Sequence, residues 1–388
     1  MSAQPSIVEF APPDIGEEEI REVVAALRSG WLTTGPRARR LESEFAALCG
    51  ARHAVALSSC TAALHLALLG CGIGPGDEVI VPTMTFAATA EVVLAVGAIP
   101  VLVDVEADTL CMDPQAAQEA VTGRARALLV VHYGGQAADV SALQALADRH
   151  RLTLIDDAAH AVWTTYGERP VGSLARATCF SFYATKNLTT GEGGMLTTDD
   201  EHLAARVRTL SLHGISRDAR QCSASHRSWD YDIRSAGWKY NMSDIAAALG
   251  LAQLRRLPQM QERRAALAAR YDRAFQGIPE IEILRDPARG RHSHHLYVIL
   301  LKLERLRIDR PRFIEELQQR GIAASVHFKP LHLHPLYAEA GAGRIHPAPV
   351  AEAAYPRLVS LPLSSAHREE EMDRVVQAVK EIVRSNRC

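Results

Sequence analysis

The sequence predicts an α/β fold built around a buried, mostly parallel sheet, with a smaller α+β domain at the C-terminus. Short apolar runs, such as Ala54–Leu57 and Glu78–Val81, alternate with stretches of helical periodicity between residues 54 and 155. Runs of this length between helices are typical of strands covered on both faces. After the helical region at 244–275, the predicted strands and helices follow an α+β pattern instead. We therefore expect a large domain over residues 1–250 and a small domain over residues 251–388.

The elements follow in order along the chain. Two amphipathic helices are predicted first, one over 16–29 and one from the turn at Pro36 to about Cys49. Predicted strands at 54–57, 78–81, 100–104, 127–131 and 152–155 then alternate with predicted helices at 61–69, 86–96, 114–121 and 139–150. Further predicted elements are a strand at 178–182, a helix at 200–211, a polar loop at 213–240, a helical region at 244–275 broken at Pro258, a strand at 295–303, a helix at 310–320, a strand at 322–326 and a helix at 367–385.

The composition excludes several classes of protein. A net charge of −2, with no block of Lys or Arg, gives no electrostatic footprint for nucleic acid. The seven cysteines are odd in number and form no C-x-x-C pair, which favours reduced thiols over a disulfide framework. The N-terminal segment does not read as a signal peptide, and no run approaches the ~18 apolar residues of a membrane span. We therefore expect a cytoplasmic protein with no membrane partner.

The segment Ser181–Met195 carries a lysine in an unusual position. A predicted strand leads into a loop of small and hydroxyl residues, in which Gly191, Gly193 and Gly194 allow tight turns. Lys186 lies just past the strand end, where partial desolvation would leave its amine neutral and reactive near neutral pH. Lys186 is therefore a candidate Schiff-base nucleophile, and the alternative is an ordinary surface lysine on a turn.

A second motif lies between a predicted strand end and a predicted helix start. Ser58, Ser59, Cys60 and Thr61 combine small side chains with the free N–H groups and positive end of a helix. Such a segment is a candidate phosphate site, and the alternative is an ordinary Ser/Thr helix cap. The same helix end would lower the pKa of Cys60 somewhat. The glycine-rich run 70–76 follows a helix instead of a strand, so we interpret it as a helix end and turn, not a dinucleotide loop.

Asp156, Asp157 and His160 follow the predicted strand 152–155. A carboxylate there can keep a heteroaromatic nitrogen protonated, and His160 is close enough in the chain to contact the same ring. One aspartate at a strand end could simply cap a helix. Two aspartates and a histidine make capping alone a poor explanation.

Six further histidines invite a zinc interpretation. They have neither the helical His-Glu-x-x-His spacing nor a Cys/His finger spacing, so we expect no metal site. Contact with a sugar or a carboxylate is the more plausible role for some of them. They are His292, His294, His295, His327, His332 and His334.

In their order along the chain, these motifs resemble one known family. The segment around Ser59, then Thr85–Phe86, then Asp156–His160, then Ser181–Asn187 with its glycines, is similar to the DegT/StrS-type nucleotide-sugar aminotransferases. That resemblance implies the aspartate aminotransferase (type I) fold of enzymes that depend on pyridoxal 5′-phosphate (PLP). It also implies a homodimer with active sites shared between subunits.

The resemblance implies a role for each matching residue. Lys186 would form the Schiff base with the cofactor and shuttle the proton, and Asp157 would keep the ring nitrogen protonated. Phe86 would stack on the ring, and His160 would lie near its phenolic oxygen. The residues expected to hold the phosphate are Ser59, Cys60, Thr61 and Ser181. The sequence departs from the family at Cys60, where glycine is usual.

Two further segments match the family. Gly237–Asp244 resembles the segment that reaches the cofactor of the partner subunit, where Lys239 and Asn241 replace the Asn and Arg of many members. This Lys/Asn form resembles the branch that aminates 4-keto sugars. A stretch near the sugar site is matched over 325–330, and the expected substrate contacts are His327 and His332.

The expected reaction transfers an amino group from L-glutamate to a nucleotide-linked keto-6-deoxy sugar, with pyridoxamine 5′-phosphate as the second cofactor form. C4 amination of a sugar such as dTDP-4-keto-6-deoxyglucose is the first expectation, and amination of a 3-keto sugar is the second. Lys186 argues against the dehydratase branch of the family, which has histidine at that position. Two alternatives from other classes remain. A non-catalytic PLP-binding regulator of the same fold would normally carry a DNA-binding appendage. An NAD-linked sugar enzyme would need a glycine fingerprint after a strand, which the sequence lacks.

Overall fold

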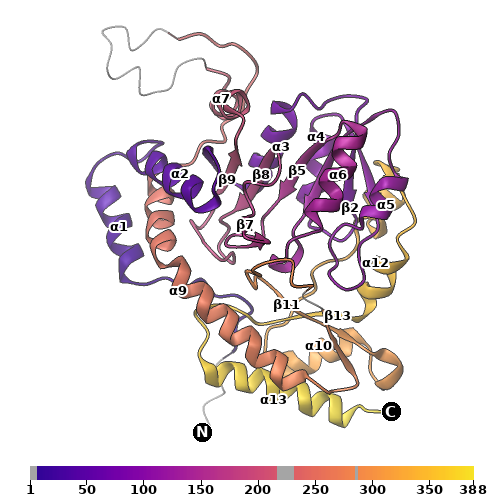
Figure 1. The fold of residues 1–388 in the computed structure, drawn as a ribbon. Helices are drawn as coiled ribbons and strands as arrows, with labels where there is room; N and C mark the ends of the chain where they lie inside the picture. Colours follow the sequence, from indigo (N-terminus) through magenta and orange to yellow (C-terminus); the bar gives the residue numbers. More distant parts are fainter. Residues whose placement is uncertain (1–6, 216–230, 285–286) are drawn as a thin grey trace.

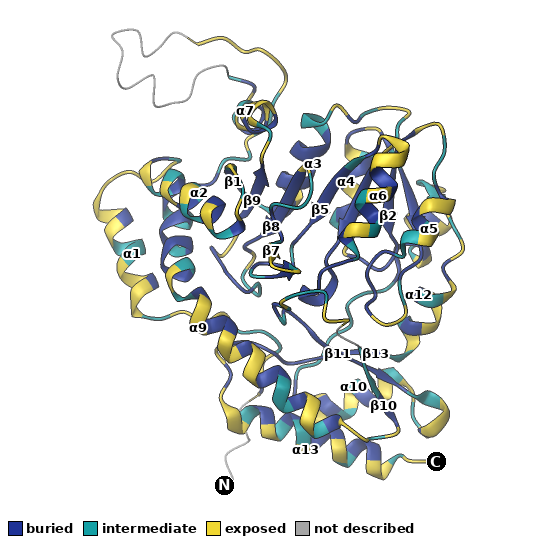
Figure 2. Cartoon of the chain, viewed as in Figure 1, coloured by how far each residue is buried: buried dark blue, intermediate teal, exposed yellow. Residues whose placement is uncertain are grey.

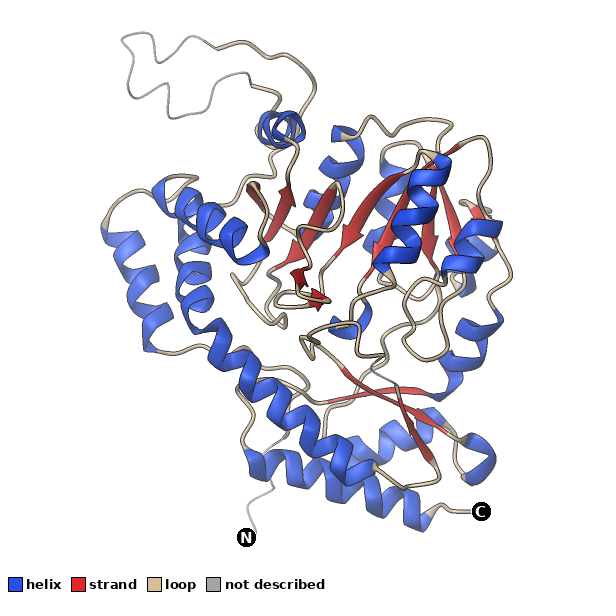
Figure 3. Ribbon diagram, viewed as in Figure 1, coloured by secondary structure: helices blue, strands red, loops and turns tan. Residues whose placement is uncertain are grey.

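The computed structural model describes residues 7–215, 231–284 and 287–388, which form two bodies (Figure 1). The larger body holds an eight-stranded sheet with helices on both faces. The smaller body holds a three-stranded sheet packed with helices near the C-terminus (Figure 3). This arrangement confirms the predicted α/β fold with a mostly parallel central sheet. None of the described helices is both long enough and apolar enough to cross a membrane.

The bounds of the elements agree with most of the predicted ranges. The helices are α1 (Glu17–Arg28), α2 (Pro36–Cys49), α3 (Cys60–Gly70), α4 (Ala87–Ala95), α5 (Pro114–Glu119), α6 (Val140–His150), α7 (Glu201–Leu210), α9 (Asp244–Phe275), α10 (Arg310–Gln319), α11 (Pro335–Ala338), α12 (Pro349–Ala354) and α13 (Glu369–Ser385). The strands are β1 (His53–Leu57), β2 (Glu78–Pro82), β3 (Ile99–Val103), β4 (Ala125–Val131), β5 (Thr153–Asp157), β6 (Thr165–Tyr166), β7 (Arg169–Pro170), β8 (Ala177–Ser181), β9 (Gly194–Thr198), β10 (Ile281–Ile283), β11 (Tyr297–Leu301), β12 (Arg344–Ile345) and β13 (Leu358–Leu361). Helix α3 ends at Gly70, so the glycine-rich run after it is a helix end and turn, as predicted.

The register of the central sheet brings several strand ends together. Its strand order is β1-β9-β8-β5-β4-β2-β3-β12, in which β9 is antiparallel to both neighbours and the other pairs are parallel. Because two reversals restore the direction, β1 runs parallel to β8. Gly194, at the start of β9, is opposite both Leu57 and Ser181, and Asp157 is opposite Cys179. The loops that follow β1, β5 and β8 therefore emerge side by side.

Alternate residues of the sheet strands pack into different hydrophobic clusters. In β2, Val79 and Val81 lie in the cluster formed with α3 and α4, whereas Ile80 lies in the cluster formed with α5 and α6. Figure 2 shows the strands buried between helices whose outer faces are exposed. Burial on both faces explains why these strands are nearly continuous apolar runs in the sequence.

Helix α9 corrects one prediction, because it continues through Pro258. A proline inside a helix costs about 3 kcal/mol, chiefly through the lost N–H and a clash with the preceding turn. Apolar burial on both sides offsets that cost: Leu257 packs in the cluster with α2, and Tyr271 packs in the core of the smaller body. The helix thus joins the two bodies (Figure 1). It also runs through the predicted boundary at residue 250, and that division stays a prediction.

The predicted strand at 322–326 is wrong. Only isolated pairs form there, Ile322 with Val8 and Ser325 with Ser360, so no continuous ladder develops. Val8 also packs in the hydrophobic cluster of the smaller body, although it belongs to the N-terminal segment. Of the polar loop predicted at 213–240, residues 216–230 lie outside the described residues.

Candidate active site

A cavity of about 530 Å³ lies between the carboxyl ends of the central strands and segments from the C-terminal part of the chain. Nine of the predicted site residues line it: Ser59, Cys60, Thr61, Phe86, Asp157, His160, Ser181, Lys186 and His327. We call Ser59, Cys60, Thr61, Asp157, Ser181 and Lys186 the sheet wall, because they end or follow strands of the central sheet. We call His295, His327 and Phe328, which face them from the C-terminal segments, the closing wall.

Lys186 lies in the loop between β8 and β9, and it is half-buried. Its backbone N–H donates to the carbonyl oxygen of Tyr183 at 2.9 Å, which closes a turn just after the strand. Burial lowers the pKa of the Lys186 amine to about 8, although Asp157 and Cys60 act in the opposite direction. At pH 7 about one amine in ten is then neutral. The local environment therefore supports the predicted nucleophile.

The two adjacent aspartates have different environments because successive side chains of a strand point to opposite faces. Asp157 lines the cavity, and its carboxylate accepts hydrogen bonds from Thr89 Oγ1 (2.8 Å) and from the backbone N–H of Ala159 (3.1 Å). Burial raises the pKa of Asp157 despite these donors. Asp156 lies 3.3 Å from Nε2 of the buried His132, and it does not line the cavity. This geometry favours Asp157 as the residue that faces a ligand.

The first turn of α3 is a ready anion site. Ser59 is the N-cap, and its Oγ accepts a hydrogen bond from the backbone N–H of Ala62 at 3.0 Å. The first N–H groups of a helix have no partner within the helix and favour negative charge. Gly194 packs directly on this turn, because a Cβ there would lie 2.3 Å from the Ser59 carbonyl carbon and 2.6 Å from the Cys60 nitrogen. The cap and the phosphate site predicted as alternatives are therefore compatible.

Cys60 behaves differently from the prediction. Its Sγ is 3.4 Å from the carbonyl oxygen of Cys179 and 3.9 Å from Asp157 Oδ1, so it points toward the carboxylate. Burial, reinforced by the negative charge of Asp157, raises the pKa of the Cys60 thiol well above its ordinary value. The expected lowering of this pKa is wrong, because desolvation outweighs the helix end. The thiol stays protonated near neutral pH.

Aromatic rings surround the middle of the cavity. His160 is buried, and its Nδ1 accepts a hydrogen bond from the backbone N–H of Gly134 at 3.3 Å. Burial and the nearby Lys186 charge hold the pKa of His160 well below its usual range, so the ring is neutral. Phe328 stacks on His160 with ring centroids 6.0 Å apart, and Phe86, which is 61% exposed, lies 6.0 Å from Phe328.

The closing wall contains a residue that sequence reasoning missed. His295 Nε2 lies 3.4 Å from Lys186 Nζ, although the two residues are far apart in the chain. The sequence places His295 in a run of histidines, for which a metal site and contacts with a sugar or a carboxylate were considered, but not a contact with the lysine. His327, which was predicted, lies nearby with Nδ1 2.9 Å from Ser360 Oγ, and burial lowers its pKa to about 4.

Three predicted site residues do not line the cavity. Lys239 is exposed and donates a hydrogen bond to the side chain of Asn241, which in turn donates to Thr34 Oγ1 at 2.6 Å. His332 is buried, with Nδ1 2.6 Å from Thr83 Oγ1 and Nε2 3.2 Å from Glu352. The predicted sugar contact of His332 therefore stays a prediction.

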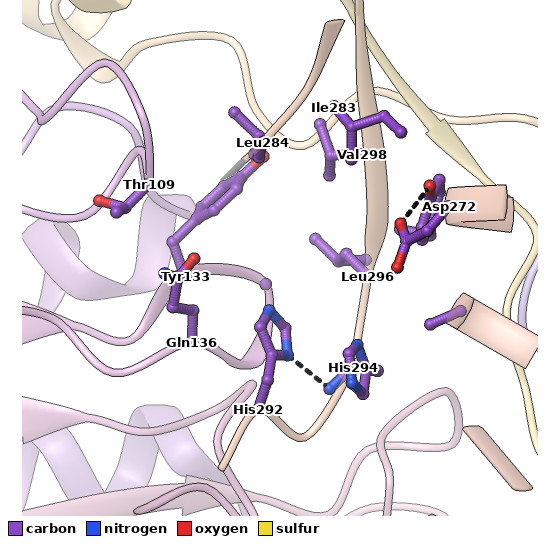
Figure 4. A pocket seen from close by; sticks show the side chains of 13 residues that line it. Thr109, Tyr133, Gln136, Asp272, Ile283, Leu284, His292, His294, Leu296 and Val298 are labelled. Atoms are coloured by element: carbon purple, nitrogen blue, oxygen red, sulfur yellow. Dashed lines mark hydrogen bonds between the residues drawn. The ribbon is translucent and has the colours of Figure 1, made fainter. Parts of the chain in front are cut away.

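A second cavity, of about 90 Å³, is lined by residues of the 292–298 segment together with side chains such as Tyr133 and Asp272 (Figure 4). Nδ1 of His292 accepts a hydrogen bond from the backbone N–H of His294 at 2.8 Å, and Tyr297 donates to Asp272 at 2.7 Å. Across the described ranges, no group of three or more His, Cys, Asp or Glu side chains could hold a metal ion.

The larger cavity fits PLP. A partly neutral lysine amine, a buried carboxylate with room for a further donor, and a helix N-terminus line one continuous space. These are the groups that can link an aldehyde, hold a protonated pyridine nitrogen and bind a phosphate. The six described cysteines are free.

Comparisons with known proteins agree with this geometry. The model of the DegT/DnrJ/EryC1/StrS aminotransferase family matches residues 13–380. The spore coat polysaccharide biosynthesis protein SpsC of Bacillus subtilis is 49% identical over 376 residues, which cover 97% of each chain.

Solved structures give the same result. Spr1654 from Streptococcus pneumoniae, described as a sugar aminotransferase, superposes in its PMP form with a TM-score of 0.92 and 38% identity over 97% of this chain and 99% of that chain. A PLP form of the same protein has a TM-score of 0.90. DesI, solved in the presence of its TDP-sugar product, has a TM-score of 0.87 and 32% identity over 98% of this chain and 93% of that chain.

Proposed function

The chain belongs to the DegT/DnrJ/EryC1/StrS aminotransferase family and is a PLP-dependent sugar aminotransferase, and from this premise we propose its substrates and the roles of its residues. The proposed reaction moves the amino group of L-glutamate to C4 of a nucleotide-linked 4-keto-6-deoxy sugar. The observation that carries the proposal is the arrangement of the sheet wall, in which Lys186, Asp157 and the first turn of α3 line one cavity.

Each residue of the site has a proposed role in the reaction that follows from its chemistry. Bound PLP supplies an electron sink for the transferred amine. Lys186 links the cofactor and then acts as general base and acid at Nζ, for which a pKa of about 8 is well suited. Asp157 holds the proton on the ring nitrogen, because Thr89 and the Ala159 N–H leave lone pairs free on its oxygens. The start of α3 and Ser181 bind the phosphate.

The choice of a 4-keto sugar rests on finer features. Lys239 and Asn241 have the residue types that resemble the 4-keto branch, and they form a hydrogen-bonded pair. The relative DesI, with its TDP-sugar product, supports a nucleotide sugar as acceptor. His327 is proposed to contact the sugar, because it lines the cavity with a neutral ring that can both donate and accept hydrogen bonds. His332 is proposed as a second sugar contact from the sequence alone.

The substrate test is direct. Purified protein is incubated with L-glutamate and a panel of 3-keto and 4-keto nucleotide sugars, and the product is examined by NMR. We expect amination at C4, with Lys186→Ala as the inactive control. Amination at C3 would contradict the regiochemistry and leave the enzyme class unchanged. Binding of PLP without turnover of any keto sugar would favour a non-catalytic protein of the same fold.

We also propose a homodimer with shared active sites. Lys239 and Asn241 lie outside the cavity of their own chain, and both the exposure of Lys239 and its charge suit it to the phosphate of a partner subunit. Mixing two inactive variants, Lys186→Ala and the double variant Lys239→Ala/Asn241→Ala, tests this proposal. Each heterodimer would hold one site with both lesions and one intact site, so activity should return. No recovery after verified subunit exchange would contradict shared sites.

A further inference from the structure

A chain of hydrogen bonds joins the loop of Lys186 to the segment that carries His295. The side-chain nitrogen Nδ2 of Asn187 donates to the carbonyl oxygen of Ser293 at 2.7 Å. This bond fixes the amide so that its oxygen faces the other way, where Oδ1 lies 3.0 Å from His295 Nδ1. The opposite ring nitrogen, His295 Nε2, is 3.4 Å from Lys186 Nζ.

These contacts fix the tautomer of His295. An amide oxygen only accepts hydrogen bonds, so His295 Nδ1 must carry the ring hydrogen and Nε2 must hold the lone pair. We infer that His295 is a positioning residue that accepts one N–H of the Lys186 amine at Nε2. No proton is transferred in this contact. It fixes the rotation of the amine, so that the lone pair of Lys186 is directed away from His295. This inference rests on the proposed role of Lys186.

The charges around the contact are consistent with this role. Burial holds the pKa of His295 well below its ordinary value, and Lys186, His160, Arg264 and His327 act in the same direction. His295 is therefore neutral and presents a lone pair instead of a second N–H group.

Other titratable groups lie around Lys186. Asp157 from β5 and Cys60 from α3 raise the pKa of the amine. His160 and His327 are neutral because their own pKa values are lowered. Of the described side chains, His295 is the one whose hydrogen bond to Lys186 Nζ is seen.

The ring of His295 also packs against His160, with centroids 4.4 Å apart. The experiment must therefore distinguish this packing from the proposed hydrogen bond to Lys186. His295→Phe keeps an aromatic ring but removes the acceptor. His295→Gln removes the ring but can place an amide oxygen near the position of Nε2. His292→Asn is the matched control on the same segment, because asparagine can still accept from the backbone N–H of His294.

The measurement uses the apoenzyme. Lys186 is labelled with an amine reagent across a pH series, and the labelled peptide is quantified by mass spectrometry. The wild-type midpoint should lie near pH 8. In His295→Phe the midpoint should fall by about one pH unit, because the charged amine loses a hydrogen-bond acceptor. Turnover should fall about 10–100-fold through misplacement of the amine, and His295→Gln should recover part of both effects.

The outcomes are distinct. Equal midpoints and equal turnover in His295→Phe and His295→Gln would overturn the inference, and so would His292→Asn matching His295→Phe. If His295→Phe does not fold, Asn187→Leu takes its place. Loss of Asn187 Oδ1 frees the tautomer of His295, and an unchanged Lys186 midpoint would then contradict the inference. The labelling needs neither cofactor nor sugar, so it decides the role of His295 even if the proposed substrates fail.

Discussion

The sheet wall and the closing wall of the cavity are held in place in different ways. Residues of the sheet wall end strands or lie in the loops that follow them, and backbone register sets where these loops begin, as where Gly194 is opposite both Leu57 and Ser181. The closing wall comes from segments outside the central sheet, held by isolated backbone pairs such as Ser325 with Ser360 and by side-chain contacts such as that of His327 with Ser360. The comparison teaches that the groups proposed for chemistry lie on the side that the central sheet positions. We propose that the other side contacts the sugar and orients the amine of Lys186.

If this division is correct, the largest loss should follow from removing the amine of the sheet wall. Lys186→Ala should lower transamination by about 10⁴-fold or more, because one amine both links the cofactor and moves the proton. The protein should still fold and bind pyridoxamine 5′-phosphate. Borohydride reduction and peptide mapping check the assignment, with Lys302→Ala as a distant control. Labelling of a lysine other than Lys186 would contradict the assignment of Lys186 as the residue that links the cofactor.

The next largest effect should come from the carboxylate of the sheet wall. Asp157→Asn should slow turnover by about 10²–10³-fold, because the ring nitrogen loses its anionic partner in a buried site. The neighbouring variant Asp156→Asn sharpens the test, since Asp156 faces the buried His132. Asp156→Asn should lower the melting temperature while leaving turnover nearly unchanged. Normal activity of Asp157→Asn with an inactive Asp156→Asn would reverse the assignment.

A smaller effect is expected where the sheet wall depends on close backbone packing. In Gly194→Ala the new Cβ would collide with the first turn of α3. Accommodation costs about 1–3 kcal/mol, and we expect a similar loss of cofactor affinity, or about 10–100-fold. Titration of the apoenzyme with PLP measures it. Gly123→Ala, where a Cβ meets nothing within 4 Å, is the control and should bind normally.

The smallest effect is expected in the closing wall. Phe328→Leu removes the ring that stacks on His160 and lies near Phe86. Loss of one such ring contact is worth about 0.5–1.5 kcal/mol, so KM for the sugar should rise by about 2–10-fold while kcat changes little. Steady-state kinetics at saturating glutamate give both values. A loss as large as that of Asp157→Asn would show that the two walls share the chemistry.

The same contrast explains what could be predicted from the sequence. Lys186, Asp157 and Ser59 were predictable because each follows a strand in a local motif, and the carboxyl ends of strands meet at one edge of a sheet. The contact of His295 with Lys186 was not predictable, since it depends on how a distant segment packs. The predicted lowering of the Cys60 pKa was wrong for a related reason. The local helix end was visible in the sequence, but the burial that outweighs it was not.

The proline within helix α9 affects how easily this helix bends. Both bodies are attached to this one rod, which passes from the cluster around Leu257 to the one around Tyr271. Pro258 has no N–H to complete the helical ladder, so the rod is most compliant there. The part beyond Pro258 is roughly 26 Å long, and each degree of bend therefore moves its far end by about 0.5 Å. A bend of a few degrees at Pro258 would therefore displace the far end of the helix by an ångström or more.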